Sequence, residues 1–206
     1  MLKGIIRKWI PRRHVKYDNT FFQEQWFSSW DELKLVLAKL IESHPKWKRI
    51  LDFGCGPGIM IDFMTDKSYE YIGCDYSVDA NKLYIERYGH NPELYANSLS
   101  DSSCQQKFDV FLSFDVFEHL TDDQICTVLK EVPNIPTLFL NISRTRGIPG
   151  HINLKSDRSW IRFMEKQNYS FDAPETEKIR NLYSSLREGS PDHWNKNLFI
   201  FHKIHH

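Results

Sequence analysis

The chain has 206 residues, of which 41% are hydrophobic and 26% charged, and its 27 basic and 27 acidic residues give a formal net charge of zero. This length and composition predict one folded domain and exclude a disordered tail or a coiled coil. Because no apolar run approaches the roughly 18–20 residues that a membrane helix needs, we expect a protein that is soluble or peripheral to a membrane.

The charges are distributed unevenly along the chain. Residues 1–17 hold six of the basic residues and no acid, so residues 18–206 carry a net charge of −6. We interpret residues 1–16 as a basic amphipathic segment that either contacts an anionic membrane surface or packs on the domain. Residues 17–206 form the single domain, and their acidic balance argues against a nucleic-acid partner.

The cysteines predict the compartment. Cys55, Cys74, Cys104 and Cys126 show neither a CxxC motif nor the short spacings of a zinc site. In a chain of this size the pattern favours free thiols in a reducing environment. We therefore expect a cytoplasmic protein.

Helical and β-rich segments alternate along the chain. Helices are expected at 31–43, with Ser29 or Asp31 as the cap, and at 59–65, 79–88, 121–132 and 156–167. Strands are expected at 49–53, 69–74, 94–95, 108–114, 137–142, 169–172 and 198–204. Such alternation predicts an α/β fold, a Rossmann-like and mostly parallel sheet with helices on both faces.

A glycine cluster follows the first strand. In ILDFGCGPGIM, Gly54, Gly56 and Gly58 lie between an apolar strand and a helix. Glycine permits positive φ and lets a ligand approach the backbone, and the helix N-terminus offers unpaired N–H groups to an anion. Asp75 ends the second strand, 17 residues after Gly58. A carboxylate there is suited to bind the ribose hydroxyls of an adenosine-containing cofactor.

The spacing of the glycines distinguishes between cofactors. A nicotinamide-binding loop reads GxGxxG, whereas this loop reads GxGxG with Ile59 following. The string from Asp52 to Gly58 instead resembles the first motif of class I S-adenosylmethionine-dependent methyltransferases. The resemblance implies a seven-stranded sheet with a reversed last strand and a loop that receives the methionine portion of S-adenosylmethionine. A nicotinamide-dependent oxidoreductase is kept as an alternative.

The same resemblance implies further cofactor contacts. Tyr76 would lie on the adenine face, and Asn97 or Ser98, with Asp101 competing, would meet the adenine amino group. Carbonyl groups around Ser113 and Phe114 would face the ammonium group of the cofactor. Tyr17 is the residue expected to contact the cofactor from the N-terminal region.

The segment FDVFLSFDVFEHL matches the family's fourth strand and the loop after it. If residues 115–120 are helical, Asp115, Glu118 and His119 share one face. His151 follows the fifth strand, so His119 and His151 are expected to converge. Three interpretations stay open: a histidine general base, a structural Glu–His pair, and a divalent metal bound by Asp115, Glu118, His119 and His151 as in related quinone-biosynthetic and small-RNA methyltransferases.

The resemblance implies methyl transfer to an oxygen or nitrogen atom of a small-molecule or saccharide acceptor. The alternatives are a metal-dependent 2′-O-methyltransferase of RNA and a regulatory protein that binds S-adenosylmethionine without turnover. The C-terminal FHKIHH places three histidines on an expected edge strand and tail, where we do not expect a metal site.

Overall fold

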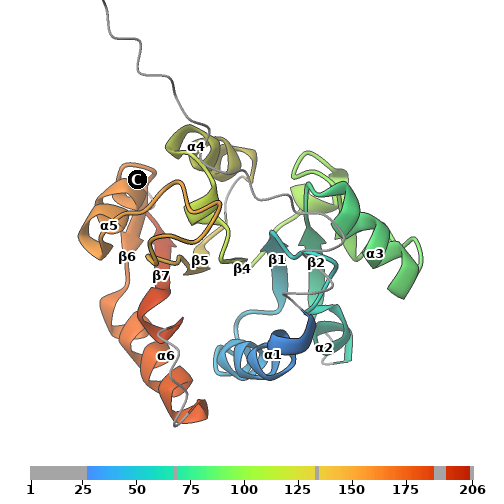
Figure 1. The fold of residues 1–206 in the computed structure, drawn as a ribbon, viewed down its shortest axis with the longest axis horizontal. Helices are drawn as coiled ribbons and strands as arrows, with labels where there is room; N and C mark the ends of the chain where they lie inside the picture. Colours follow the sequence, from blue (N-terminus) through green and yellow to red (C-terminus); the bar gives the residue numbers. More distant parts are fainter. Residues whose placement is uncertain (1–26, 67–68, 133–134, 188–193, 205–206) are drawn as a thin grey trace, which may run out of the picture.

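The computed structural model describes residues 27–66, 69–132, 135–187 and 194–204. These residues form a seven-stranded sheet with the strand order β3-β2-β1-β4-β5-β7-β6 (Figure 1). The N-terminal segment 1–16 and Tyr17 lie outside the described residues. Within the described ranges, no helix combines the length and the apolar character that crossing a membrane requires.

The sheet has the predicted number of strands and is mostly parallel, as predicted. Its strands are β1 (Arg49–Phe53), β2 (Glu70–Cys74), β3 (Tyr95–Ala96), β4 (Val110–Phe114), β5 (Thr137–Asn141), β6 (Tyr169–Phe171) and β7 (Leu198–Lys203). The pairings β1–β2, β1–β4, β2–β3 and β4–β5 are parallel, whereas β7 runs antiparallel to both β5 and β6. The α/β class and the reversed last strand are therefore confirmed.

Helices cover both faces of this sheet. They are α1 (Phe27–Glu42), α2 (Ile61–Asp66), α3 (Val78–Tyr88), α4 (Asp122–Glu131), α5 (Asp157–Glu165) and α6 (Ala173–Leu186). Side chains of α1, α2, α3 and α6 share one core cluster, and those of α4 and α5 share the other. All residues of β4 and β5 are buried, as expected for central strands covered on both sides.

Side-chain caps fix where the helices begin. The hydroxyl of Ser77 accepts a hydrogen bond from the backbone N–H of Ala80, and Thr121 forms a reciprocal capping box with Gln124. These starts lie within two residues of the predicted ones. The first helix differs, because α1 begins at Phe27 and not after a cap at Ser29 or Asp31.

Helix α6 was not predicted. Its N-cap is Asp172, whose Oδ1 accepts a hydrogen bond from the N–H of Glu175 at 2.8 Å. Pro174 occupies the first turn. An Asp–x–Pro–Glu start is a readable helix signal, but the polar sequence that follows it obscures the helical period.

Strand β7 is not at the edge of the sheet, contrary to the prediction for the C-terminal histidines. It lies between β5 and β6, and His202 is opposite both Thr137 and Ser170. The reason is that the short segment 169–171 pairs with the outer side of β7 and so becomes the edge strand. His205 and His206 lie outside the described residues.

The close packing of β2 against the glycine loop positions the site. The N–H groups of Gly54 and Cys55 donate to the carbonyl oxygen of Cys74, at 2.8 and 3.4 Å. A Cβ atom at Gly73 would lie 2.7 Å from Sγ of Cys55. Gly73 is therefore required by space and not by backbone angle, since it lets the loop lie directly on β2.

We predict that Gly73→Ala destabilises the protein by about 1–3 kcal/mol, as overpacking does in a tightly packed core. Cys55→Ala removes the clashing sulfur, so the cost of Gly73→Ala should fall by about 1 kcal/mol in the double variant. Urea unfolding of the wild type, both single variants and the double variant measures this coupling. Additive costs would contradict the packing described here.

Candidate functional site

The glycine loop, residues 54–58, has a backbone that favours glycine. Gly54, Gly56 and Gly58 have φ angles of 78°, 56° and 81°, which residues with a Cβ adopt at a cost. A Cβ atom at Gly54 would in addition lie 2.3 Å from Cγ2 of Val116. The loop therefore brings bare backbone to the carboxyl edge of the sheet, where open α/β sheets bind ligands.

Asp75 joins the end of β2 to this loop. Its Oδ2 accepts a hydrogen bond from the N–H of Gly56 at 2.8 Å, and its Oδ1 accepts one from the N–H of Ser77, also at 2.8 Å. Burial raises the pKa of Asp75, and the two backbone hydrogen bonds offset part of this rise. The acid predicted to bind ribose thus lies directly beside the predicted methionine loop.

Asp52 lies beneath the loop, in β1. Only 5% of its surface is exposed, and its Oδ2 accepts a hydrogen bond from the hydroxyl of Tyr71 at 2.6 Å. Burial raises the pKa of Asp52 to about 7, even though the Tyr71 hydroxyl lowers it in part, and the charge of Asp75 adds to the rise. Asp52 therefore supports the floor of the site from inside the sheet.

Two more tyrosines hold the loop, and sequence reasoning missed them. The hydroxyl of Tyr95 donates to the carbonyl oxygen of Gly56 at 3.0 Å, and that of Tyr88 donates to the carbonyl of Gly58 at 3.3 Å. They come from β3 and α3, far along the chain. No local motif marks such contacts, because their function depends on the sheet order.

The predicted adenine side is formed after β2 and β3. Tyr76 is 52% exposed and packs edge-on against Phe53, with ring centroids 6.0 Å apart. The carboxylate of Asp101 accepts hydrogen bonds from the N–H groups of Asn97 and Ser98, at 3.1 and 3.3 Å. Asp101 thus shapes the turn, while Asn97 is exposed at the same edge as Asp75.

The end of β4 closes the floor beside the loop. Ser113 is buried, and Phe114 packs edge-on against Phe139 with ring centroids 5.0 Å apart. Phe114 lines a small cavity together with Asp52 and Gly54. The structure therefore brings the predicted residues from β1 and β4 to one place.

Residues 115–120 do not form an α-helix, so the condition under which Asp115, Glu118 and His119 would share one helix face is not met. Asp115 has a φ of 54°, and only Phe117–His119 form a short 3₁₀ turn. As a result, Oδ2 of Asp115 accepts a hydrogen bond from the indole N–H of Trp194 at 2.9 Å. No motif in the sequence predicts this contact from Trp194, which lies 79 residues away in the chain.

Glu118 is an internal anchor for two loops. It is fully buried, and its Oε1 accepts a hydrogen bond from the N–H of Ser143 at 2.9 Å. Its carbonyl oxygen accepts from the N–H groups of Ile152 and Asn153, at 2.9 and 3.0 Å. Burial, reinforced by the charge of Asp115, raises the pKa of Glu118 well above its usual value.

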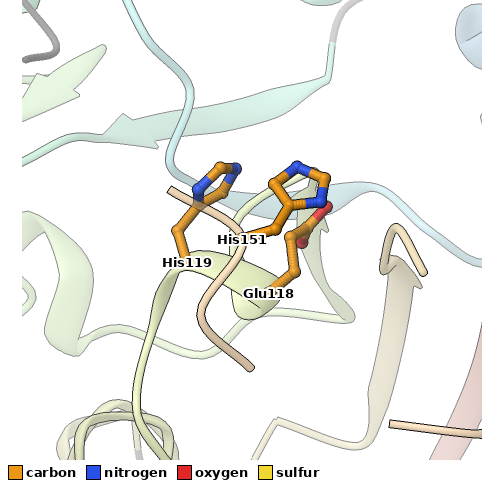
Figure 2. A group of neighbouring side chains, drawn as sticks. All are labelled: Glu118, His119 and His151. Atoms are coloured by element: carbon orange, nitrogen blue, oxygen red, sulfur yellow. The ribbon is translucent and has the colours of Figure 1, made fainter. Parts of the chain in front are cut away.

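His119 and His151 converge, as predicted. Their ring centroids are 4.7 Å apart and their planes are nearly perpendicular (Figure 2). Burial lowers the pKa of His119 to about 4, with a further contribution from the charge of His151. Burial also lowers the pKa of His151, whose Nδ1 lies 3.1 Å from the carbonyl oxygen of Thr145. Both rings are therefore neutral near pH 7, and the carbonyl orients His151 with its Nε2 as the basic nitrogen.

Three of the four predicted metal ligands lie together. One ligand atom from each of Glu118, His119 and His151 falls within 4.8 Å of the others (Figure 2). Asp115 hydrogen-bonds to Trp194 instead. Two neutral imidazoles and a carboxyl group are suitable donors for a divalent transition metal, although the raised pKa of Glu118 disfavours the ionised form that binds an ion.

A cleft opens beside these histidines. It is lined by residues 146–152 and Leu154 and has a volume of about 640 Å³, within the usual range for small-molecule sites of about 300–1,000 Å³. His151 borders it, and the exposed side chains of Ile148 and Ile152 give it an apolar wall. His151 thus borders a cleft large enough for a small molecule.

We predict that Asp52 makes the ligand-free protein less stable as the pH rises. The folded protein retains the Asp52 proton up to about pH 7, against a usual pKa of 3.8, so its contribution to stability is lost between about pH 4 and 7. Asp52→Asn has no such loss. As the pH rises from 5 to 8, its free energy of unfolding should therefore increase by about 2–3 kcal/mol relative to that of the wild type. Urea unfolding at both pH values measures the gain.

Asp109 provides the matched control. Burial by itself would raise the pKa of Asp109, but hydrogen bonds from Arg49 and Lys48 outweigh it and lower this pKa. Its carboxylate is therefore ionised in both folded and unfolded chains from pH 5 to pH 8, and the stability difference of Asp109→Asn from wild type should stay constant across that range. If Asp52→Asn behaved like Asp109→Asn, the raised pKa of Asp52 would be wrong.

Two curated relatives are similar to part of this chain. The ubiquinone biosynthesis O-methyltransferase of Nitrobacter winogradskyi is 31% identical over 90 residues, covering 40% of this chain and 34% of the relative. The enzyme of the same name from Cereibacter sphaeroides is 33% identical over 79 residues, covering 36% and 32%. The matched part thus spans about a third of the length of these relatives.

Solved structures share the fold across most of the chain. The plantazolicin methyltransferase BpumL, in complex with S-adenosylhomocysteine and a substrate analogue, superposes with a TM-score of 0.60 at 14% identity, covering 86% of this chain and 87% of its own. The 1,6-didemethyltoxoflavin-N1-methyltransferase of Burkholderia thailandensis gives a TM-score of 0.58 at 12% identity, covering 86% and 80%.

The family model described as "Methyltransferase domain" matches residues 22–173. This range includes the glycine loop, Asp75 and the convergent histidines, and it excludes most of α6 and all of β7. From this match, the chain belongs to the methyltransferase-domain family.

Proposed function

We propose that this protein transfers a methyl group from S-adenosylmethionine to an oxygen atom of a small-molecule acceptor. The observation that carries the proposal is the contact between Asp75 and the glycine loop at the carboxyl edge of the sheet, where Oδ2 of Asp75 lies 2.8 Å from the N–H of Gly56. A ribose-binding acid and a backbone cradle are thereby adjacent, in a chain of the methyltransferase-domain family.

The residues present are suited to this cofactor. The positive φ at Gly54 and the clash that a Cβ there would have with Val116 keep side chains off this part of the loop, and Asp75 offers carboxylate oxygens to ribose hydroxyls. Tyr76, with 52% of its surface exposed, offers an aromatic face to adenine, and Asn97 and Ser98 offer polar groups to its edge. When bound, S-adenosylmethionine supplies a methyl group that its sulfonium already activates. The protein is left to align the acceptor and to take up its proton.

The cleft beside His151 supports an acceptor of small-molecule size. Its apolar wall, formed by Ile148 and Ile152, suits a hydrophobic molecule, and Arg146 adds a positive charge at its rim. The curated relatives that match part of the chain are named O-methyltransferases, which favours a hydroxyl group as the nucleophile. The net charge of −6 over residues 18–206 weighs against RNA as the acceptor.

We assign His151 as the general base. The Thr145 carbonyl oxygen lies 3.1 Å from its Nδ1, so the Nδ1 proton stays there and Nε2 receives the proton of the acceptor hydroxyl. Glu118 is a positioning residue, because its backbone carbonyl anchors the loop that carries His151 and its side chain binds the N–H of Ser143. His119 packs against the His151 ring and restricts its orientation.

A metal-dependent reaction is the second candidate. It is favoured by the ligand atoms of Glu118, His119 and His151, which lie within 4.8 Å of one another. A divalent ion bound there would lower the pKa of an acceptor hydroxyl without a protein base. The chelation experiment below distinguishes the two candidates.

Calorimetry tests the cofactor site. We expect saturable binding of S-adenosylhomocysteine, weakened at least about 100-fold by Asp75→Ala, because the variant loses both the ribose acceptor and the contact to Gly56. Asp109→Ala is the control. Asp109 precedes the amino-terminal end of β4, at the opposite end of the strand from the cofactor site, so this variant should leave the affinity unchanged. No binding to the wild type at high micromolar concentration would refute the proposal.

Radiolabel transfer tests the base. The protein, methyl-labelled S-adenosylmethionine and a deproteinised small-molecule extract should yield a labelled organic product, and His151→Gln should slow this transfer about 10²–10⁴-fold. Binding of S-adenosylhomocysteine should stay within about twofold of wild type, since His151 is placed on the acceptor side. Label transfer that fails in wild type while the cofactor binds would favour a non-catalytic binding protein.

Exhaustive chelation completes this test. With His151 as the base, transfer by the chelated wild type continues at its initial rate. If transfer stops and added divalent ions restore it, the metal-dependent candidate replaces the general base.

A further inference from the structure

A second cluster of histidine and carboxylate groups lies away from the site described above. Asp172 and Glu175 are at the start of α6, and His202 is near the end of β7. One ligand atom from each lies within 4.8 Å of the others. His202 pairs with Thr137, the first residue of β5, whereas the glycine loop and His151 follow the carboxyl ends of their strands. The cluster and the methyl-transfer site are therefore at different ends of the central strands.

Hydrogen bonds to other parts of the protein orient Asp172 and His202. Asp172 uses its Oδ1 to cap α6 through the N–H of Glu175 at 2.8 Å, and directs Oδ2 to Nε2 of His202 at 3.1 Å. The other ring nitrogen of His202, Nδ1, lies 3.2 Å from the hydroxyl of Thr137. In metal-ligating histidines the nitrogen that does not bind the metal is commonly held by such an outer hydrogen bond, which fixes the orientation of the ring.

His44 orients the third group. It is 8% exposed and stacks on Trp47, with ring centroids 3.9 Å apart. Its Nδ1 lies 2.9 Å from the carbonyl oxygen of Leu40, and its Nε2 lies 2.6 Å from Oε1 of Glu175. Carboxylates that bind metals are commonly held by such an outer hydrogen bond. His44 thereby fixes Glu175 from the turn that follows α1, 131 residues away in the sequence.

We propose that Asp172, Glu175 and His202 form a binding site for a divalent transition-metal ion, with His44 as the residue that positions Glu175. An imidazole with two carboxylates suits Zn²⁺ or a similar ion better than Mg²⁺ or Ca²⁺, which prefer oxygen ligands alone. Solvent completes the coordination. The bound ion clamps the start of α6 to β7, beside the hydrogen bond between the Thr176 hydroxyl and the N–H of Ile200 at 2.9 Å.

The experiment uses the full chain carrying His205→Ala and His206→Ala, so that the C-terminal histidines do not bind the probe. Zn²⁺ is titrated against a chromophoric chelator, and thermal unfolding is recorded with and without Zn²⁺. At a free Zn²⁺ concentration about 100 times the Kd, we expect the Tm to rise by about 5–10 °C. No rise in Tm and no Zn²⁺ bound in competition with the chelator would overturn the proposal.

Variants locate the ion. His202→Gln and Glu175→Gln should each abolish the rise in Tm, and His44→Gln should weaken Zn²⁺ binding about 10–100-fold. His151→Gln is the matched control, because it removes a ligand from the other histidine cluster and should leave the rise intact. A rise lost in His151→Gln and retained in His202→Gln would assign the ion to that cluster and overturn the proposal.

Two further controls keep the outcome decisive. Glu175 is one-third exposed, so Glu175→Gln decides the matter if His202→Gln does not fold. S-adenosylhomocysteine binding is measured on the same variants and should be unchanged, which keeps this test independent of the proposed methyl transfer.

Discussion

The attachment of the glycine loop to the end of β2 is the constraint on which the site depends. Two loop N–H groups bind the carbonyl oxygen of Cys74, and a third binds Asp75. Because β2 adjoins β1, the strand that leads into the loop, these contacts hold the turn flat against the sheet edge. The positive φ angles of the glycines are the conformational consequence. Without them the backbone could not face outward from this edge.

Two carboxyl groups at this edge of the sheet are costly to bury. Asp52 and Glu118 are almost completely inaccessible to solvent, and burial raises the pKa of each. Buried carboxyl groups lower stability unless they are protonated or fully hydrogen-bonded. Their concentration at one edge of the sheet is the pattern expected where function, and not stability, determines the residues.

The sequence predicts most of the fold because its signals are local. Strand–glycine–helix order, alternating elements and caps such as Thr121 are each read within a few residues, and the structure has them in place. Helix α6 was missed although Asp172 and Pro174 mark its start. The predicted edge position of β7 was wrong because β6, a strand of only three residues, pairs with its outer side and forms the edge of the sheet.

The site is predictable where its residues lie in a motif or directly after neighbouring strands. Gly54, Gly58 and Asp75 follow from strand ends, and the approach of His119 to His151 follows from the adjacency of β4 and β5. The orientation of Asp115 does not, because its positive φ turns the carboxylate toward Trp194, a residue after α6. Contacts of this kind depend on tertiary packing, and no regular spacing of residues in the sequence marks them.

Helix α6 connects the two ends of the molecule. Its first turn holds the carboxylates of Asp172 and Glu175, while Tyr183, near its last turn, stacks on Trp194 with ring centroids 6.0 Å apart. Trp194 in turn donates to Asp115, beside the buried Glu118. The helix is thus fixed at its start by His202 of β7 and by His44, which follows α1, and at its end it orients a carboxylate at the carboxyl edge of the sheet. Because a packed helix moves as a unit, whatever secures its first turn also limits how far Trp194 and Asp115 move.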